Sequence, residues 1–354
     1  MKILYFPRHG DGAIEMALVC RGAKIGLEIS GKDNGLCRAN TTSADLVGLR
    51  KLGVATPDRA EVIRKLTQRD YSAVLVHQAY QVDDFRELLQ SLHPDIPLIV
   101  RQSSEGIRPM KECGMRNFIS TSQRALDQFP ECNTCLKPKL LDWSRLPTAE
   151  HHPSSRTGVV SYINHYTAAW PVAYRKFQEL NQILKPPVIN YGIGSPAGVV
   201  RDLATMLASR ATVHIKNGGA CCFAVVRSMA MGTPVVMDRE TWRQGYFDGV
   251  DGLLVRENLS EVADELTRLQ HDDAYWVSTS RDTLQQAKRQ FTYRKTLGRE
   301  FRKFVKRCIQ DSVVQPSSRS PNHLADSDVG MNVLFDIHER ITHAAKRLYC
   351  RFLR

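Results

Sequence analysis

Two successive series of alternating strands and helices limit the fold of this 354-residue chain more than any other feature. The first series opens with Lys2–Phe6, a short apolar segment, and continues after a turn with Ile14–Cys20, whose apolar residues have helical spacing. Ala23–Ile29 then returns to the pattern of a strand. Because strand-helix-strand units are almost always right-handed with parallel strands, we predict that the chain begins with a parallel sheet covered by helices.

The same alternation fills the rest of the first half of the chain. Further strands are predicted at Ala73–His77, Pro97–Val100 and Asn117–Ser120, and helices at Asp58–Leu66, Val82–Leu92 and Gln123–Phe129. Helices of about ten residues between short buried strands are typical of a doubly wound α/β domain.

A second series starts near residue 158 and repeats the pattern. Its predicted strands are Gly158–Ile163, Pro187–Tyr191, Thr212–Ile215 and Pro234–Met237, and its helices are Val172–Leu184, Val199–Ser209, Phe223–Met231 and Leu259–Gln270. A long basic helical stretch, Asp282–Gln310, follows. We therefore predict an α/β chain of two tandem Rossmann-like domains with a deep interdomain cleft, followed by a basic helical C-terminal tail.

These patterns divide the chain into five parts. Residues 1–150 are predicted to form the first domain, 151–157 a linker, and 158–310 the second domain with its closing helices. Residues 311–335 are rich in Ser, Pro and Asp, which is typical of a flexible linker. Residues 336–354 carry apolar side chains at helical spacing with Lys and Arg on the other faces, which predicts a basic amphipathic helix.

The net charge of +12 is concentrated near the C-terminus. From Arg281 to Arg354 there are sixteen Lys or Arg against seven Asp or Glu, so +9 of the total lies in the last fifth of the chain. A protein that binds duplex nucleic acid in its main cleft would carry its positive charge along that cleft. A basic C-terminal end instead favours an anionic membrane surface or another polyanion as partner.

Other sequence features narrow the class of protein. No run approaches the roughly 18 apolar residues that span a bilayer, and no signal-peptide pattern opens the sequence, so we expect a cytoplasmic protein.

The nine cysteines lack the dense even spacing of a disulfide scaffold. Cys132 and Cys135 have the spacing of a zinc half-site without a second pair, and the only Asp-x-Asp, at 326–328, falls in the predicted linker. We therefore expect no metal site.

One stretch of the second half carries a resemblance to a known family. It runs from Thr212 to Val236 and reads TVHIKNGGACCFAVVRSMAMGTPVV. This stretch resembles the donor-site region of group-1, family-4-like glycosyltransferases with the GT-B fold. In that family a strand ends in a His-Pro-Ser-like triplet, a Gly-rich loop follows, and a helix closes in Glu-Ala-Met-Ala-x-Gly-x-Pro-Val-Val. His214 matches the His of the triplet, and Met229–Val236 matches the closing segment.

Weaker matches extend the resemblance over about residues 1–270. Gly245–Val255 resembles a Gly-rich Asp-Gly segment of the family, and Tyr191–Pro196 resembles its Tyr-Gly-x-Gly-Pro turn. Gly22–Ile29 resembles a Gly-His-Glu-Val strand entry. The family's Glu-x7-Glu pair is missing, because its two positions fall on Gly219 and Arg227. In relatives these carboxylates contact the sugar and ribose of the donor, so their loss bears on both sugar choice and activity.

The resemblance implies a nucleotide-sugar site in the second half, with a UDP- or GDP-sugar as donor and no covalently bound cofactor. A Gly-rich loop that opens a helix points backbone N–H groups at an anion and suits a diphosphate. The alternative is that the loop is only a turn and that Arg227 is a solvated side chain. The predicted donor-binding residues are Asn164, His165, Gly192, Gly194, Ser195, His214, Lys216, Asn217, Gly218, Gly219, Ala220 and Arg227.

The acceptor is expected on the first domain, at the carboxyl ends of its strands, where open α/β sheets bind ligands. A His or a carboxylate there can act as the base that deprotonates an acceptor hydroxyl. The candidate catalytic residues are His9, Asp11, His77 and Glu105. For each alone a structural role is the stronger alternative, and His9 with Asp11 leads because their loop is Gly-rich and is expected to face the cleft.

Three functions fit these features. The first is transfer of a sugar from a nucleoside-diphosphate sugar to a glycan or lipid-linked acceptor, without a metal, with the basic tail holding the enzyme on the inner membrane face. The second is glycosylation of modified DNA or another polyanion. The third is a GT-B scaffold that binds nucleotide or glycan without turnover, which the missing Glu pair favours.

Overall fold

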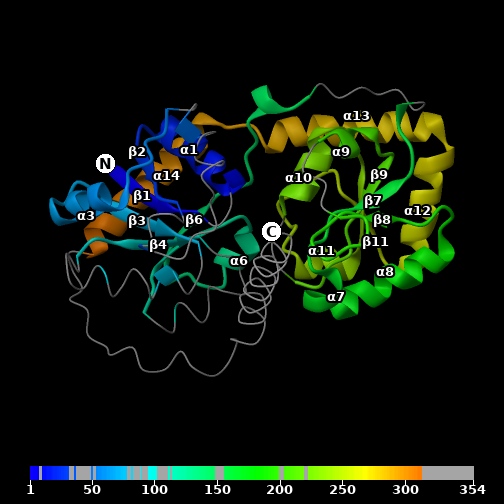
Figure 1. Ribbon diagram of the computed structural model, residues 1–354, viewed down its shortest axis with the longest axis horizontal. Coiled ribbons are helices and arrows are strands. Elements are labelled where there is room, and N and C mark those ends of the chain that lie inside the picture. The colour runs from blue at the N-terminus through cyan, green and yellow to red at the C-terminus, as the bar shows by residue number, and fades with distance from the viewer. Residues whose placement is uncertain are drawn as a thin grey trace, which may run out of the picture.

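The structure, a computed structural model, places two α/β domains side by side (Figure 1). It describes residues 1–7, 10–31, 36, 49–50, 53–77, 81–82, 88, 95–101, 111, 114–147, 155–198, 203–218 and 222–312, with the side chain of Asp11 left out. The predicted tail at 336–354 and all but two residues of the predicted linker at 311–335 lie outside these ranges.

The first domain is built on a six-stranded parallel sheet in the order β2-β1-β3-β4-β5-β6. Its strands are β1 (Lys2–Phe6), β2 (Gly26–Ile29), β3 (Ala73–Val76), β4 (Leu98–Arg101), β5 (Asn117–Ser120) and β6 (Asn133–Leu136). Alternate residues point to opposite faces, so Ile3 and Tyr5 enter one core while Leu4 and Phe6 enter the other. Helices cover both faces, which explains why the central strands β1 and β3 are almost entirely apolar.

The second domain has a five-stranded parallel sheet in the order β11-β10-β9-β7-β8. Its strands are β7 (Val159–Ser161), β8 (Ile189–Asn190), β9 (Ala211–Val213), β10 (Val235–Asp238) and β11 (Leu254–Arg256). Two apolar clusters again lie on opposite faces, one around Phe177 and Leu266 and the other around Met229 and Phe247. The predicted pair of doubly wound α/β domains is confirmed.

Helices connect the strands in both domains. They are α1 (Gly10–Ala23), α3 (Arg59–Thr67), α6 (Gln123–Leu126), the 3-10 helix η2 (Trp143–Arg145), α7 (Tyr166–Ala169), α8 (Pro171–Ile183), α9 (Ala204–Ala208), α10 (Phe223–Ala230), α11 (Arg239–Gln244), α12 (Leu259–His271), α13 (Asp273–Gln290) and α14 (Lys295–Ser312). Several begin at a side-chain cap. For α12, Asn258 accepts a hydrogen bond from the N–H of Glu261 at 3.0 Å, and the buried Val262 and Leu266 form its inner face.

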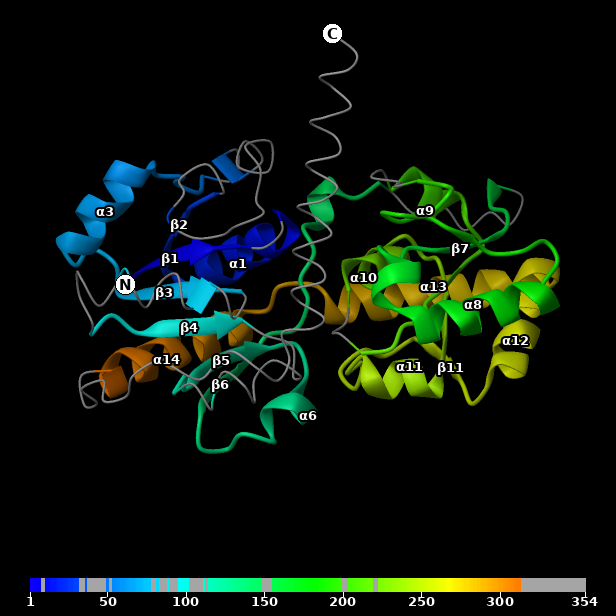
Figure 2. The ribbon, with the colours of Figure 1, turned by 60° about the horizontal axis from the view of Figure 1, so that its bottom comes forward.

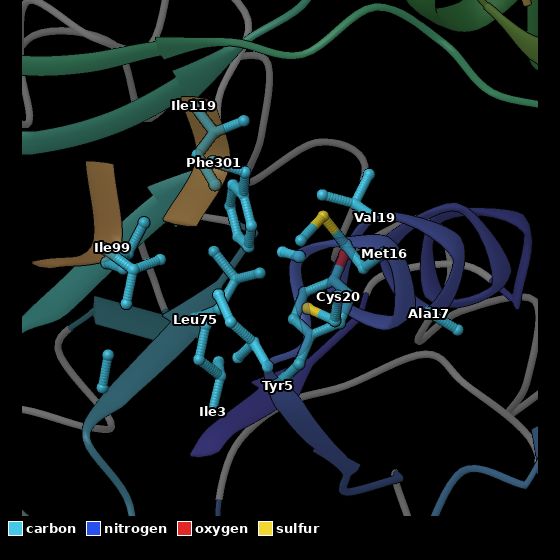
Figure 3. Close-up of a cluster of buried hydrophobic side chains, with 14 of the residues drawn as sticks. Ile3, Tyr5, Met16, Ala17, Val19, Cys20, Leu75, Ile99, Ile119 and Phe301 are labelled. Atoms are coloured by element: carbon cyan, nitrogen blue, oxygen red, sulfur yellow. The ribbon is translucent and has the colours of Figure 1, made fainter. Parts of the chain in front are cut away.

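The C-terminal helices differ from their prediction. The expected single helical stretch, 282–310, consists of α13 and α14, separated at Phe291–Arg294. The expected second domain includes α14, yet this helix packs against α1 and β6 of the first domain. Figures 1 and 2 show the chain crossing back after α13. Figure 3 shows Phe301 of α14 among side chains of the first sheet and of α1.

Predicted and observed elements otherwise agree within a few residues for the described part of the chain. The strands at Lys2–Phe6 and Asn117–Ser120 are confirmed at both ends. The sequence analysis missed β6, β11, α7 and α11. All four are short, and Asn133–Leu136 begins with two polar residues, while Arg239–Gln244 lacks an apolar stripe. Most of the predicted helix at 82–92 lies outside the described residues. No helix in the described part of the chain is long and apolar enough to cross a membrane.

A buried cluster of charges joins α1 to the first sheet. The Glu15 carboxylate of α1 is fully buried and forms ion pairs with the guanidinium of Arg101, at the end of β4, and with Lys137, whose Nζ lies 2.7 Å from Oε1. It also accepts a hydrogen bond from the backbone N–H of Leu140 at 3.0 Å. Although burial alone would raise the pKa of Glu15, the charges of Arg101 and Lys137 lower it to about 2.

We predict that Glu15→Gln lowers the free energy of unfolding by about 3–5 kcal/mol, because it leaves two buried cations without a countercharge. Urea titration at pH 7 followed by circular dichroism measures this difference. Since the folded pKa lies below the ordinary carboxyl value of about 4.3, the stabilisation is complete above that pH and is lost as pH falls toward 2. The difference between the two proteins should therefore shrink in acid.

Glu300→Gln is the matched control, because Glu300 pairs with Lys303 at 3.2 Å on the exposed face of α14. Exposed pairs contribute little to stability, so its midpoint should equal that of the wild type. Equal midpoints for Glu15→Gln and the wild type would show that the buried cluster does not stabilise the first domain.

Candidate functional site

The strand order of each sheet points to one place for a ligand. Starting from β8, the second sheet runs second, first, third, fourth, fifth in chain order, so its direction of winding reverses between β7 and β9. Ligands of open α/β sheets bind beyond the carboxyl ends of the strands at such a reversal. The loops after β7 and β9 contain Asn164, His165, His214 and Lys216, which the sequence analysis selected on other grounds.

The loops after β7 and β8 are joined by hydrogen bonds. The Asn164 Oδ1 accepts a hydrogen bond from the N–H of Ile193 at 2.9 Å, and the N–H of His165 donates to the Ile193 carbonyl at 2.6 Å. His165 is buried and adopts a left-handed backbone with φ 53°. A Cβ atom on Gly192 would lie 2.2 Å from the Ile163 carbonyl oxygen, so this loop contact requires glycine.

The rest of the Tyr191–Ser195 turn is held by short local bonds. Ser195 Oγ donates to the Asn190 carbonyl at 2.5 Å. Gly194 has φ +80°, a conformation that favours glycine, and a Cβ there would meet open space. The predicted donor residues Asn164, His165, Gly192, Gly194 and Ser195 therefore lie together in one hydrogen-bonded double loop.

His214 directly follows β9 and is buried, with its ring 5.7 Å from that of Phe247. Burial lowers the pKa of His214 to about 3, and the positive charge of Lys216 acts in the same direction. The imidazole is therefore neutral at pH 7, which suits it to hydrogen bonding rather than to carrying charge.

Lys216 is positioned by the elements on either side of its loop. Its backbone N–H donates to Thr241 Oγ1 at 3.2 Å, at the start of α11, and its ammonium lies 4.1 Å from the centre of the Trp170 ring. Tyr166 Oη donates to the Ile215 carbonyl at 2.5 Å and ties the loop to α7. Asn217 and Gly218 follow, the latter with φ 75°, while Gly219 and Ala220 lie outside the described residues.

The loop leads into α10, whose first turn has no acidic residue. Its N-cap residue, Cys222, makes no side-chain hydrogen bond to the helix. Two cations flank the ring of its first residue, Phe223: Arg227 of the same helix at 5.9 Å and Lys139 of the first domain at 4.2 Å. An N-terminus of this kind presents backbone donors and a positive field, which is the arrangement that binds phosphate.

Of the four candidate catalytic residues, the structure describes the side chain of one. His77 follows β3, at the carboxyl edge of the first sheet, and its Nδ1 lies 3.4 Å from the Tyr5 hydroxyl. Its backbone N–H donates to Gln81 Oε1 at 2.7 Å. His9 and Glu105 lie outside the described residues, and Asp11 is placed only as part of α1.

The loops beyond β5 and β10 touch, so the two domains meet near these strand ends. Ser122 Oγ donates to Asp248 Oδ1 at 2.8 Å, and Arg124 Nη2 donates to the Arg243 carbonyl at 2.6 Å. The Arg124 guanidinium also lies 4.9 Å from the centre of the Tyr246 ring. The sequence analysis missed these residues, because a contact across 120 positions leaves no local pattern.

Within the described ranges, no three His, Cys, Asp or Glu side chains gather as metal ligands. No protein-family model matches the chain, and no curated protein matches it in sequence.

Solved structures that match the chain are similar to it over most of its length. HepE from Anabaena, in complex with UDP-glucose, superposes with a TM-score of 0.57 at 14% identity, covering 89% of this chain and 99% of its own. Sucrose-phosphate synthase from Thermosynechococcus elongatus gives 0.53 at 12% identity, covering 88% and 100%. An alpha-glucosyltransferase bound to UDP and a 13-mer DNA with an A:G mismatch gives 0.56 at 12%, covering 86% and 98%. These likenesses establish that the chain has the GT-B fold.

We predict that Gly192→Ala destabilises the second domain by about 1–3 kcal/mol, since the new methyl group overlaps the Ile163 carbonyl and forces the loops apart. Gly194→Ala is the matched control. Its methyl group meets open space, so only the left-handed backbone costs about 1–2 kcal/mol. Thermal melting compares the two, and a loss for Gly192→Ala no larger than for Gly194→Ala would contradict the close loop contact.

Proposed function

We propose that this chain is a glycosyltransferase that transfers a sugar from a nucleoside-diphosphate sugar, with UDP as the leaving nucleotide. The observation that carries the proposal is the loop from His214 to Gly218, which joins β9 to the N-terminus of α10 at the reversal point of the second sheet. Solved structures with the same fold hold UDP or UDP-glucose, which supports UDP over GDP as the nucleotide.

The chemistry of transfer fits this loop. Breaking the bond between the sugar and the diphosphate develops negative charge on the leaving group, and preformed donors lower the energy of that state. In our proposal the backbone N–H groups at the start of α10 donate hydrogen bonds to the diphosphate. Lys216 and Arg227 neutralise the charge of the diphosphate without a metal ion. In the same proposal, the neutral His214 forms a hydrogen bond to the donor. Asn164 and His165, which belong to the double loop, line the other side of the site.

The acceptor would lie against the first domain. We propose His77 as the base for its hydroxyl, because it directly follows β3 at the carboxyl edge of that sheet. His9, Asp11 and Glu105, which follow β1 and β4 in the sequence, are further candidates. A glycan or lipid-linked acceptor is our preferred class. The solved glucosyltransferase complex with DNA supports the alternative of a polyanionic acceptor.

One observation favours a non-catalytic alternative. Arg227 stands where the family resemblance expects the second carboxylate of a Glu pair, and Gly219 stands at the first. A site without these carboxylates keeps its diphosphate contacts and loses groups that contact the sugar and ribose in relatives. The chain would then bind nucleotide or glycan as a scaffold without turnover.

We predict that UDP raises the melting temperature of the protein and that Gly219→Asp abolishes the shift, because the substitution places a carboxylate in the proposed diphosphate loop. A thermal-shift panel of UDP, GDP, ADP, CMP and TDP, with both proteins, measures this. Glu300→Gln, on α14, serves as a control that should respond to UDP like the wild type. No shift with any nucleotide would contradict donor binding, and a shift with another base would contradict the choice of UDP.

We further propose that the basic tail holds the enzyme at an anionic, inner membrane face. The support is the +9 of charge from Arg281 onward and the amphipathic pattern of residues 336–354. Of this charge, +7 lies in residues 281–313, where Arg299, Arg302, Lys303, Lys306 and Arg307 of α14 are exposed, and +2 lies in residues 314–354.

We predict that the full chain sediments with vesicles containing anionic lipid and that a chain ending at Val313 does so several-fold less. Raising the salt concentration should weaken the binding of the full chain, because the attraction is electrostatic. Neutral vesicles are the control for apolar binding. If the shortened chain binds equally well, the exposed basic face of α14, and not the tail, makes the contact.

A further inference from the structure

The two domains contact each other through the ends of two short helices, α6 and α11 (Figures 1 and 2). At the start of α6, the Asp248 carboxylate of the second domain accepts hydrogen bonds from Ser122 Oγ at 2.8 Å and from the backbone N–H of Arg124 at 3.3 Å. In return, Arg124 Nη2 donates to the Arg243 carbonyl at 2.6 Å, near the end of α11. Because helix ends leave backbone groups without a partner inside the helix, each domain completes a helix end of the other.

Side chains of the second domain surround the guanidinium of Arg124. It lies 4.9 Å from the centre of the Tyr246 ring and 5.8 Å from that of Trp242, and its buried Nε lies 3.7 Å from Asp248 Oδ1. Tyr246 has a left-handed backbone with φ 52°, which residues other than glycine seldom adopt and which persists where surrounding contacts hold it. Arg124 therefore contacts the whole turn at 242–248 rather than one residue of it.

The other end of α11 holds the loop that joins β9 to α10. The backbone N–H of Lys216 donates to Thr241 Oγ1 at 3.2 Å, and the N–H of Thr241 donates to Asp238 Oδ1 at 2.6 Å. Asp238 also pairs with Lys176 of α8 at 2.9 Å. Since α11 has only six residues, its two ends are less than two helical turns apart. This helix thus connects the contact with the first domain to the loop at Lys216.

We infer that Arg124 is a positioning residue of the first domain, which acts through α11 on the loop at Lys216. The bonds of Ser122 and Arg124 with Asp248 and Arg243 then form an interdomain latch. The inference rests on the proposed function only in treating this loop as the donor site. Because coupling between two sites is reciprocal, a nucleotide that fixes the loop would strengthen the latch by the same factor as the latch strengthens nucleotide binding.

Arg124→Met tests the inference, because methionine keeps an unbranched apolar side chain beside the Tyr246 ring and removes the guanidinium. We expect backbone amides in residues 211–218 and 239–248 to exchange with deuterium about fivefold faster than in the wild type, as mass spectrometry of these peptides measures. Peptides of α12, elsewhere in the second domain, should keep wild-type rates. Asp248→Ala removes the latch from its other side and should change the same peptides, which provides a second variant if the first folds poorly.

Each variant has a matched control at the same junction. Arg243→Met removes an exposed arginine side chain and keeps the carbonyl that accepts from Arg124. Asp251→Ala removes an exposed carboxylate three positions after Asp248. Both controls should exchange like the wild type.

The outcomes separate the latch from the proposed function. Unchanged exchange of residues 211–218 in both Arg124→Met and Asp248→Ala would overturn the inference, whatever the protein binds. Faster exchange that extends equally to α12 would also overturn it, since Arg124 would then only support the fold. UDP should bind Arg124→Met about fivefold more weakly than the wild type by calorimetry. If the wild type binds no UDP while the variants exchange faster at 211–218, the proposed function is wrong and the latch is confirmed.

Discussion

The buried Glu15 carboxylate is the interaction on which the arrangement of the first domain and the start of the interdomain crossing both depend. It links three elements that are distant in the chain: α1, the end of β4 through Arg101, and the segment after β6 through Lys137 and Leu140. Removing such a charge leaves its partners buried and unpaired, which costs far more than losing a surface pair. The Glu15 carboxylate therefore also fixes Leu140, at the point where the chain leaves the first domain for the second.

The strand order explains how two separate domains can share one site. Each sheet reverses its winding next to its first strand, so each presents loops beyond the carboxyl ends of its strands. The contacts of Ser122 with Asp248 and of Arg124 with Tyr246 bring loops of this kind from the two domains together. The loop at Lys216 is tied to the same part of the second domain, because its backbone N–H donates to Thr241 Oγ1 of α11.

The sequence predicted those parts of the molecule whose signals are local. Continuous apolar runs identified β1 and β3, and the Gly-rich stretch before Phe223 marked the proposed diphosphate loop. β6 was not predicted, because this four-residue edge strand begins with Asn133 and Thr134 and has no continuous apolar run. The placement of α14 on the first domain was also hidden, since helical spacing shows that a face is buried and not which surface covers it.

The functional and buried polar residues also differ in whether the sequence could reveal them. The double loop of Asn164 and Gly192 could be selected from sequence because turns need particular residues, and for Gly192 the structure supplies the reason in the nearby Ile163 carbonyl. Glu15, Arg101 and Lys137 gave no signal, because a buried ion cluster is assembled from single charged residues scattered over 120 positions. Their long-range partners exist only in the folded chain.

Because the Glu pair is absent, the proposed site carries more positive charge than the pattern of the resembling family predicts. With Gly219 and Arg227 at those positions, the surroundings of α10 gain a cation and lose two carboxylates relative to the pattern of the resembling family. Attraction for the diphosphate rises with this change, while the acceptors for sugar and ribose hydroxyls must come from other side chains. Under the proposed function, nucleotide affinity is thus set by backbone donors and cations at α10, and sugar choice is set elsewhere. The two properties are physically separable in this chain, and each can be lost without the other.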